Sequence, residues 1–202
     1  YTFTTMGDLV FSGELYNDTR GRWRDGVQIR TSIVQNTESS FKEGDVIQTL
    51  NSTYRLGKRS VSKWDERFME VAKLVASWSK DPSTQVGCVL VNEDRHIIST
   101  GYNGFPRGVS DCCGRYNHRP TKYAMVQHAE MNAITQAVSS TKGSTAYVTH
   151  FPCSTCMGLL INSGIKRVVT TTPDTGLSER FALSFRVSRT MAHEAKIELM
   201  ET

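Results

Sequence analysis

Two short segments constrain the structure of this chain more than any other feature of its sequence. The first is His128-Ala-Glu130, and the second, further along the chain, is Pro152-Cys-Ser-Thr-Cys156. A catalytic zinc ion usually has three protein ligands and leaves its fourth position to water. His128, Cys153 and Cys156 match that count, so the fold has to bring these three side chains to one point.

Glu130 lies two residues from a predicted ligand, where it can reach a bound water without coordinating the metal. Bound zinc lowers the pKa of water towards about 7, and the carboxylate can pass the proton of that water to a leaving ammonia. The order H-x-E…P-C-x-x-C is the signature of zinc nucleobase deaminases. A purely structural zinc site is the alternative, but it would need a fourth strong ligand, and none stands beside these three.

Composition sets the class of protein. The 202 residues carry a net charge of +4, which suits a phosphorylated substrate and is too weak to indicate nucleic acid. No apolar run approaches the roughly 20 residues of a membrane span, and no signal peptide is visible. Two of the five cysteines are needed as zinc thiolates, so we expect a reducing, cytoplasmic compartment.

Residues 1–60 differ from residues 61–202, so we expect two parts. The first part has short β-type runs at residues 9–11, 27–35 and 45–56, separated by Gly, Asn and Asp, and predicts a small β-rich extension of unknown role. Its basic turn, residues 18–26, favours a solvated hairpin loop over a phosphate- or base-binding site. That turn carries Arg20, Arg22, Trp23 and Arg24.

The second part alternates between helical and strand patterns. A helix is predicted over residues 63–80, with one apolar face that should point to the core. That face holds Trp64, Phe68, Val71, Ala72, Val75 and Trp78. Strands 86–92 and 96–103 follow, then helix 126–138, strand 145–150, helix 153–163, strand 166–171, helix 178–192 and strand 195–199. This order predicts an α/β fold with a three-layer α/β/α sheet.

Two loops could hold ligands. The glycine-rich loop 101–108 follows a strand directly, so Asn103 is either a polar contact to a sugar or base, or a residue that fixes the turn. The loop insertion 110–123 contains Cys112, Cys113 and His118, which could bind a second metal ion. Vicinal cysteines, however, cannot easily both coordinate one zinc.

The chain resembles the deoxycytidylate (dCMP) deaminases of the cytidine deaminase-like superfamily over residues 63–172. The motifs that carry the resemblance are Ser79-Lys-Asp-Pro-Ser-Thr-Gln-Val-Gly87, Gly101-Tyr-Asn-Gly-Phe-Pro106, His128-Ala-Glu-Met-Asn-Ala133 and Phe151-Pro-Cys-Ser-Thr-Cys156. The resemblance implies a homo-oligomer, often a hexamer, that converts dCMP to dUMP for dTTP synthesis. It also implies activation by dCTP, with Mg²⁺ accompanying the triphosphate, and inhibition by dTTP. Such enzymes occur in cells and in large phages, whose proteins work in the host cytoplasm.

Roles follow from the resemblance and from position in the predicted fold. Glu130 is the catalytic residue, and one zinc per chain is bound by His128, Cys153 and Cys156. The substrate-binding candidates are Asn103, Ala129 and Phe151 for the sugar and base, and Lys80, Ser83 and Thr84 for the phosphate. The allosteric candidates are Tyr102, Gly104 and Arg107.

Two alternatives remain open at this point. The enzyme could accept dCTP as well as dCMP, or instead of it. From another class, a zinc-stabilised nucleic-acid-binding or interaction module is conceivable, but such a module has no need of Glu130. Residues 1–60 and the segment after Thr172 lack a match to the family pattern, so part of the phosphate site is not assigned by the resemblance.

Overall fold

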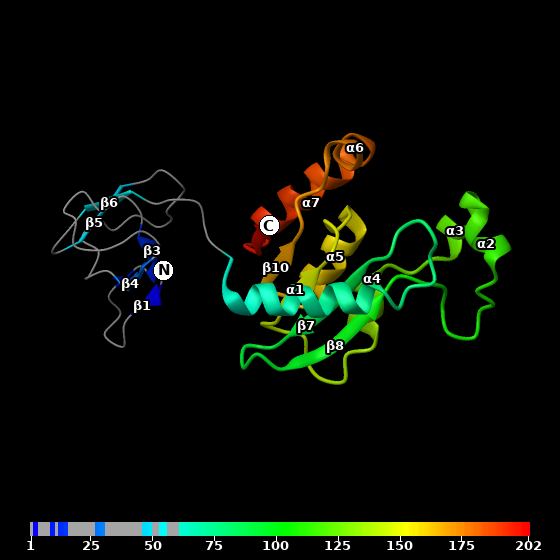
Figure 1. Cartoon of the computed structure of the whole chain (residues 1–202), viewed down its shortest axis with the longest axis horizontal. Coiled ribbons are helices and arrows are strands. Elements are labelled where there is room, and N and C mark those ends of the chain that lie inside the picture. The colour runs from blue at the N-terminus through cyan, green and yellow to red at the C-terminus, as the bar shows by residue number, and fades with distance from the viewer. Residues whose placement is uncertain are drawn as a thin grey trace. The chain divides into compact units, whose positions relative to one another are not determined.

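The computed structural model describes residues 2–3, 9–10, 12–15, 27–30, 46–49, 53–55 and 61–202 (Figure 1). The chain forms two compact units, Tyr1–Ser60 and Val61–Thr202. No helix among the described residues is long and apolar enough to cross a membrane.

The first unit contains antiparallel two-stranded ribbons. They pair β1 (Thr2–Phe3) with β2 (Leu9–Val10), β3 (Ser12–Leu15) with β4 (Val27–Arg30), and β5 (Val46–Gln48) with β6 (Thr53–Arg55). The β-rich character expected of this region is therefore present in the described segments, and the expected strand 45–56 is two strands. The basic turn 18–26 lies outside the described residues.

The second unit is built on a mixed five-stranded sheet in the order β11-β10-β9-β7-β8. β7 (Gly87–Val91) and β8 (Ile97–Tyr102) form a hairpin, and β9 (Thr145–Val148) lies antiparallel to β7 on its other side. β10 (Arg167–Thr170) and β11 (Glu198–Glu201) continue the sheet parallel to β9. The carboxyl ends of β9, β10 and β11 therefore lie at one edge.

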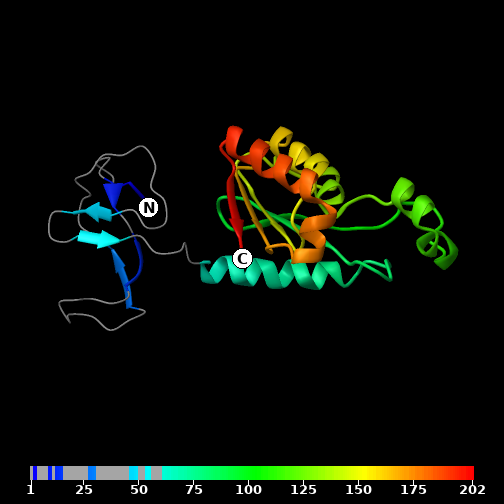
Figure 2. The same ribbon diagram turned by 90° about the horizontal axis from the view of Figure 1, so that it is seen from above.

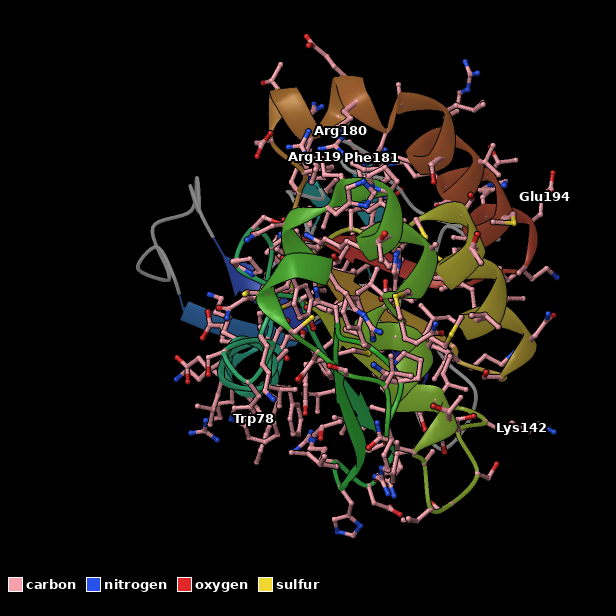
Figure 3. All side chains as sticks on the ribbon, turned by 90° about the vertical axis from the view of Figure 1, so that its right-hand side faces the viewer. Trp78, Arg119, Lys142, Arg180, Phe181 and Glu194 are labelled. Atoms are coloured by element: carbon pink, nitrogen blue, oxygen red, sulfur yellow. The ribbon has the colours of Figure 1, made fainter. Side chains whose placement is uncertain are left out.

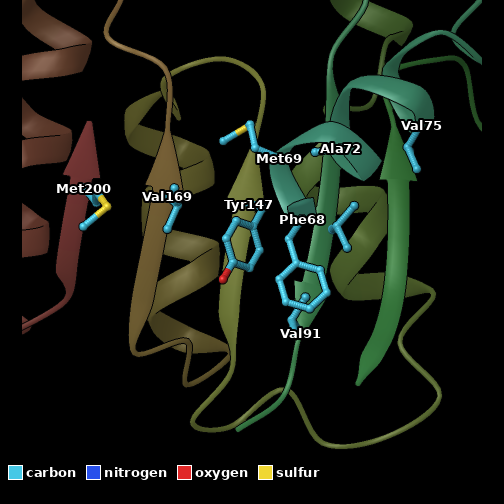
Figure 4. Close-up of a cluster of buried hydrophobic side chains, with 9 residues drawn as sticks. Phe68, Met69, Ala72, Val75, Val91, Tyr147, Val169 and Met200 are labelled. Atoms are coloured by element: carbon cyan, nitrogen blue, oxygen red, sulfur yellow. The ribbon is translucent and has the colours of Figure 1, made fainter. Parts of the chain in front are cut away.

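Helices cover both faces of this sheet, which confirms the predicted three-layer α/β/α fold. In Figure 2, α1 (Lys63–Ala76) lies on one side of the strands, and α5 (Ser154–Asn162) and α7 (Ala182–Glu194) lie on the other. Two apolar clusters reflect this division, because alternate residues of a strand face opposite sides. Val91 packs with Phe68 of α1 (Figure 4), whereas Leu90 packs with Ala133 of α4 (Ala129–Thr135).

A capping box starts α1. The Ser62 hydroxyl accepts the Asp65 N–H, and the Asp65 carboxylate accepts the Ser62 N–H, both at 3.1 Å. Asp65 is also buried against Arg167 and the Tyr147 hydroxyl, which ties α1 to β10 and β9. Burial opposes ionisation of Asp65, but the hydrogen bonds from Arg167, Ser62 and Tyr147 hold its pKa well below the usual range.

The helix predicted over residues 63–80 ends at Ala76, and two of its predicted core residues are exposed. Trp64 stacks on Phe68 with a centroid distance of 5.6 Å, but its indole remains 39% exposed. Trp78 lies beyond the end of the helix, is 51% exposed, and meets Tyr102 edge-on at 6.2 Å. The core-facing prediction was wrong for these tryptophans, because one lies in the first turn and the other past the last.

Three further boundaries differ from expectation. The predicted loop 110–123 contains α2 (Cys113–Asn117) and the start of α3 (Arg119–Met125). The expected helix 178–192 is two helices, α6 (Thr175–Arg180) and α7. The expected helix 126–138 is the shorter α4, because Gln127 forms an extended bridge with Gly104.

Candidate active site

The three predicted zinc ligands meet at the N-termini of two helices. His128 is the N-cap of α4, Cys153 is the N-cap of α5, and Cys156 lies in the first turn of α5. Their ligand atoms all lie within 4.8 Å of one another. The His128 Nδ1 is 3.3 Å from the Cys156 Sγ and 3.7 Å from the Cys153 Sγ. Tetrahedral zinc, with Zn–S of about 2.3 Å and Zn–N of about 2.05 Å, requires an N–S separation of about 3.6 Å. The donor set therefore fits zinc.

Hydrogen bonds within the ligand cluster shift the pKa values of both thiols, Cys153 and Cys156. A hydrogen bond from Cys156, and then one from His128, lowers the pKa of Cys153 to about 4. The pKa of Cys156 is raised because it donates that bond to Cys153 and is buried. A metal ion would displace the remaining thiol proton on binding, because zinc binds cysteine as the thiolate.

Glu130 lies in the first turn of α4 and is only 4% exposed. Burial raises the pKa of its carboxyl above the ordinary value. A raised pKa favours the protonated form of this carboxyl, which suits a group that has to accept a proton and give it back.

Helix α4 sits unusually close to β8 because Gly101 has no side chain. A Cβ at Gly101 would overlap the Ala133 nitrogen and the Ala129 carbonyl oxygen. The Ser99 hydroxyl donates to the Ala133 carbonyl at 2.6 Å, and the Asn132 amide donates to the Tyr102 carbonyl at 2.7 Å. These contacts fix the position of the helix that carries Glu130.

Asn103 has the turn-fixing contacts that were one of its two predicted roles. Its side-chain oxygen accepts the Val86 N–H at 2.8 Å, and its amide nitrogen donates to the Thr84 carbonyl at 2.9 Å. The residue is 6% exposed, and its own carbonyl accepts the Ser79 hydroxyl at 2.7 Å. A hydrogen bond to a sugar would have to use a donor or acceptor of this amide that is not already engaged in these two hydrogen bonds.

Asp81 is a buried hub that the sequence reasoning did not single out. It is 3% exposed, pairs with Lys122 at 2.7 Å, and accepts the Ser83 N–H and hydroxyl at 2.9 Å and the Thr84 N–H at 3.2 Å. The Asn103 amide lies 3.4 Å from its second oxygen. Burial opposes its ionisation, but Lys122 and Ser83 lower its pKa. An Asp followed by Pro-Ser-Thr is the turn signal that could have revealed the hub.

The phosphate candidates lie around this hub or on the surface. Ser83 and Thr84 both direct hydrogen bonds at Asp81, and the Ser83 hydroxyl also accepts one from Lys122. Lys80 is exposed and pairs with Asp111 at 2.6 Å.

The other candidates divide between core and surface. Ala129 and Phe151 are buried, and the Phe151 ring packs against Phe185 with a centroid distance of 5.0 Å. Tyr102 is 40% exposed, and Arg107 is exposed in the glycine-rich loop. Gly104 exchanges backbone hydrogen bonds of 3.1 and 2.8 Å with Gln127, the residue before the ligand His128.

The residues of loop 110–123 that could have bound a second metal ion do not form a ligand cluster. Within residues 61–202 and the described β segments, the zinc group above is the one cluster of three or more ligands. Cys112 and Cys113 are exposed free thiols, and the His118 Nδ1 lies 2.8 Å from the Thr121 hydroxyl.

Comparison with known proteins agrees with this geometry. Residues 62–172, more than half of the chain, match the family model described as the cytidine and deoxycytidylate deaminase zinc-binding region. The chain is 42% identical over 139 residues to an uncharacterised deaminase of Aliivibrio fischeri, covering 69% of this chain and 93% of that protein. It is 47% identical over 113 residues to the deoxycytidylate deaminase of Mus musculus, covering 53% of this chain and 64% of the mouse protein.

The fold also resembles a solved structure, the dCMP deaminase of cyanophage S-TIM5 in complex with dCMP and dUMP. The TM-score is 0.58 at 23% identity, and the match covers 71% of this chain and 100% of that one. At this identity the likeness concerns the fold alone, whereas the family match and the bacterial relative define the membership. The chain belongs to the cytidine and deoxycytidylate deaminase family.

Proposed function

We propose that this chain is a zinc-dependent hydrolase that deaminates dCMP to dUMP. One observation carries the proposal: the donor triad His128, Cys153 and Cys156 lies beside the buried carboxyl of Glu130, which a structural metal site would not require. The mouse relative is a deoxycytidylate deaminase and the cyanophage protein is a dCMP deaminase, which supports dCMP as the substrate. The nucleic-acid-binding and interaction alternatives are not favoured.

The protein's own part in the reaction is proton movement and positioning. When held by the three donors, zinc would supply a Lewis acid that lowers the pKa of water. Glu130 takes a proton from the attacking water and delivers protons to N3 of cytosine and to the departing ammonia. Water adds to C4 and ammonia leaves, so the products are dUMP and ammonia. The raised pKa of Glu130 suits a group that has to hold the proton between these transfers.

Base and sugar recognition is part of the proposal. Backbone groups at Ala129 and Phe151 read the base edge, and the Asn103 amide contacts the sugar. Sites that hydrogen-bond a substrate in this way reject analogues strongly, because the protein's own buried polar groups would otherwise be left unpaired. Phosphate binding by Ser83 or Thr84 would require these residues to share donors now directed at Asp81, and Lys80 would have to leave Asp111.

We also propose that dCTP, with Mg²⁺, and dTTP regulate the enzyme through Tyr102, Gly104 and Arg107. Support comes from the Gly104–Gln127 bridge, because a ligand that moves the loop also moves the residue before His128. Asn103→Ala should mainly damage turnover of dCMP, whereas Arg107→Ala should mainly weaken the response to dCTP. Saturation curves for dCMP with and without dCTP test this, and an unchanged response in Arg107→Ala would remove the regulatory role.

We also propose an assembly state, a compartment and a metabolic role for the enzyme. The enzyme would work as a cytoplasmic homo-oligomer, with a hexamer favoured, and feed dTTP synthesis. Its five free thiols are compatible with a reducing compartment. Residues 1–60 would be an accessory element, since every residue assigned to zinc or base lies in the second unit. A chain starting at Ser60 should retain zinc and activity, and a folded but inactive truncation would show that the extension completes the site.

A substrate panel tests the proposal directly. Purified full-length protein is assayed for ammonia release from cytidine, deoxycytidine, dCMP and dCTP, with and without dCTP or dTTP as effector. We expect dCMP to give the highest kcat/KM. A preference for dCTP would support the alternative substrate, and absence of turnover with all four in zinc-loaded protein would contradict the assignment.

A further inference from the structure

A surface hollow lies directly beside the zinc-binding helix. Its volume is about 370 Å³, and it is lined by Ser154, Arg180, Phe181, Leu183, Ser184 and Val187. Ser154 is the first residue of α5 and is adjacent to the ligand Cys153. The hollow therefore combines an apolar wall with two hydroxyls and a guanidinium, next to the proposed reaction centre.

The two hydroxyls are linked to each other. The Ser184 hydroxyl accepts the Ser154 N–H at 2.9 Å and donates to the Ser154 hydroxyl at 3.2 Å. In the part of the chain that the structure describes, the Ser154 hydroxyl proton is donated to no group. It is therefore available to a ligand in the hollow.

Arg180, the last residue of α6, supplies the positive charge. One of its terminal nitrogens donates to the Tyr123 hydroxyl at 2.7 Å, and its guanidinium carbon lies 5.1 Å from the centre of the Phe181 ring. No carboxylate pairs with it among the described residues. A guanidinium has five N–H donors, so most of the donors of Arg180 remain free while Tyr123 orients the group.

Other cations add to this charge. The pKa of Tyr123 is lowered, first by the Arg180 hydrogen bond and then by the charges of Arg180, Arg119 and Lys122. Lys122 is neutralised by Asp81, but Arg119 has no ion-pair partner among the described residues. In the view of Figure 3, Arg119, Arg180 and Phe181 lie close to one another in the upper part of the picture, and the charges of both arginines act on Tyr123. Arg180 and Arg119 thus bring two guanidinium groups without an ion-pair partner among the described residues to the surroundings of Tyr123.

The topology connects this charge to the zinc site. β9 and β10 are parallel neighbours, so the segments after them leave the same edge of the sheet. The segment after β9 carries Cys153 and Cys156, and the segment after β10 leads into α6 with Arg180. Ligands of α/β sheets bind outside the carboxyl ends of the strands.

From this arrangement we infer that Arg180, with the Ser154 hydroxyl, binds the 5′-phosphate of the nucleotide substrate. Tyr123 is a positioning residue that orients the guanidinium. Guanidinium groups pair with phosphate oxygens through two parallel hydrogen bonds. This inference rests on the proposed function and assigns the preference for a nucleotide over a nucleoside to a side chain outside the matched family region, residues 62–172.

The test compares two substrates that differ only in the phosphate. Arg180→Ala should lower kcat/KM for dCMP by about 10- to 100-fold, the range expected for hydrogen bonds to a charged group. The kcat/KM for deoxycytidine should stay unchanged, because that substrate lacks the phosphate. The matched control is Arg186→Ala on the exposed surface of α7, which should leave both values unchanged. Zinc content and the thermal unfolding midpoint of each variant verify that the site and fold persist.

Two results would overturn the inference: an unchanged kcat/KM for dCMP in Arg180→Ala, or an equal fall for both substrates. Calorimetric binding of dCMP and deoxycytidine to zinc-loaded proteins that also carry Glu130→Gln, which should not turn these compounds over, gives a readout that does not depend on turnover. If the wild-type protein deaminates neither compound, the proposed function fails, but the binding measurement still decides the role of Arg180. Loss of dCMP affinity alone when Arg180→Ala is added supports it, and equal dCMP affinity with and without Arg180→Ala contradicts it.

Discussion

Removing Asp81 should destabilise the protein more than removing its partner Lys122, although both belong to one buried ion pair. In Asp81→Ala, the ammonium of Lys122, a residue that is 7% exposed, keeps the Ser83 hydroxyl as its one hydrogen-bond partner among the described residues. Removing one member of a buried pair in this way costs about 3–5 kcal/mol. In Lys122→Met, the carboxylate keeps the donors of Ser83 and Thr84 and the nearby Asn103 amide. The free energy of unfolding should therefore fall by about as much as one hydrogen bond to a charged group contributes, about 1.5–3 kcal/mol.

Urea unfolding of the zinc-saturated protein measures both changes. With a slope of about 2 kcal/mol per M, Asp81→Ala should shift the midpoint by roughly 1.5–2.5 M and Lys122→Met by about half of that. Lys80→Met is the matched control, because Lys80 and Asp111 are a similar pair at 2.6 Å whose side chains are 70% and 44% exposed. Its midpoint should barely move, since exposed ion pairs contribute little.

The ranking of the variants decides whether the hub has the role described. Equal midpoint shifts in Asp81→Ala and Lys122→Met would refute the account of the remaining donors. A shift in Asp81→Ala no larger than that of Lys80→Met would refute the cost assigned to burial. Because Asp81 also holds the Asn103 amide, Asp81→Ala should raise the KM for dCMP even under conditions where the protein is folded.

Three further outcomes follow from the structure. The depressed pKa of Asp65 means that its carboxylate stabilises the fold above its unfolded pKa of about 3.9, and that this contribution is lost as pH falls towards the folded value. In Asp65→Asn, the free energy of unfolding should therefore fall less steeply as the pH is lowered. Glu66→Gln, at an exposed position, should leave this pH dependence unchanged. Gly101→Ala should push α4 off β8 and lower zinc affinity, measured by competition with a chelator, whereas Gly104→Ala, whose Cβ would meet only side-chain atoms at 3.8 Å or more, should keep it. Chelation of zinc should abolish turnover and zinc addition should restore it; activity in metal-free protein would contradict the proposed chemistry.

The sheet and the metal ligands could be predicted because both depend on local patterns. The strand over Gly87–Val91 is apolar throughout and buried on both faces, as a central strand should be. The spacing of Cys153 and Cys156 places both sulfurs at the start of one helix, next to the His128 Nδ1. Both features depend on residues that lie a few positions apart, so they can be recognised directly in the sequence.

The contacts that surround the site could not be predicted in the same way. Lys122 meets Asp81 across 41 residues, and Arg180 meets Tyr123 across 57 residues, so no local pattern joins them. The outward position of Trp78 was also missed, because a helical period does not say where the helix stops. Packing between distant segments decides such positions.

The most direct test of the central claim is one preparation of wild-type protein and Glu130→Gln, assayed together for zinc content and dCMP turnover. The exchange keeps the size and polarity of the side chain but removes its ability to accept a proton. We expect about one zinc per chain in both proteins. We also expect a loss of turnover in the variant larger than the ~10²–10⁴ of an ordinary acid–base group, since one carboxyl serves several proton transfers. Near-normal turnover in Glu130→Gln, or wild-type protein that deaminates dCMP without bound zinc, would contradict the account.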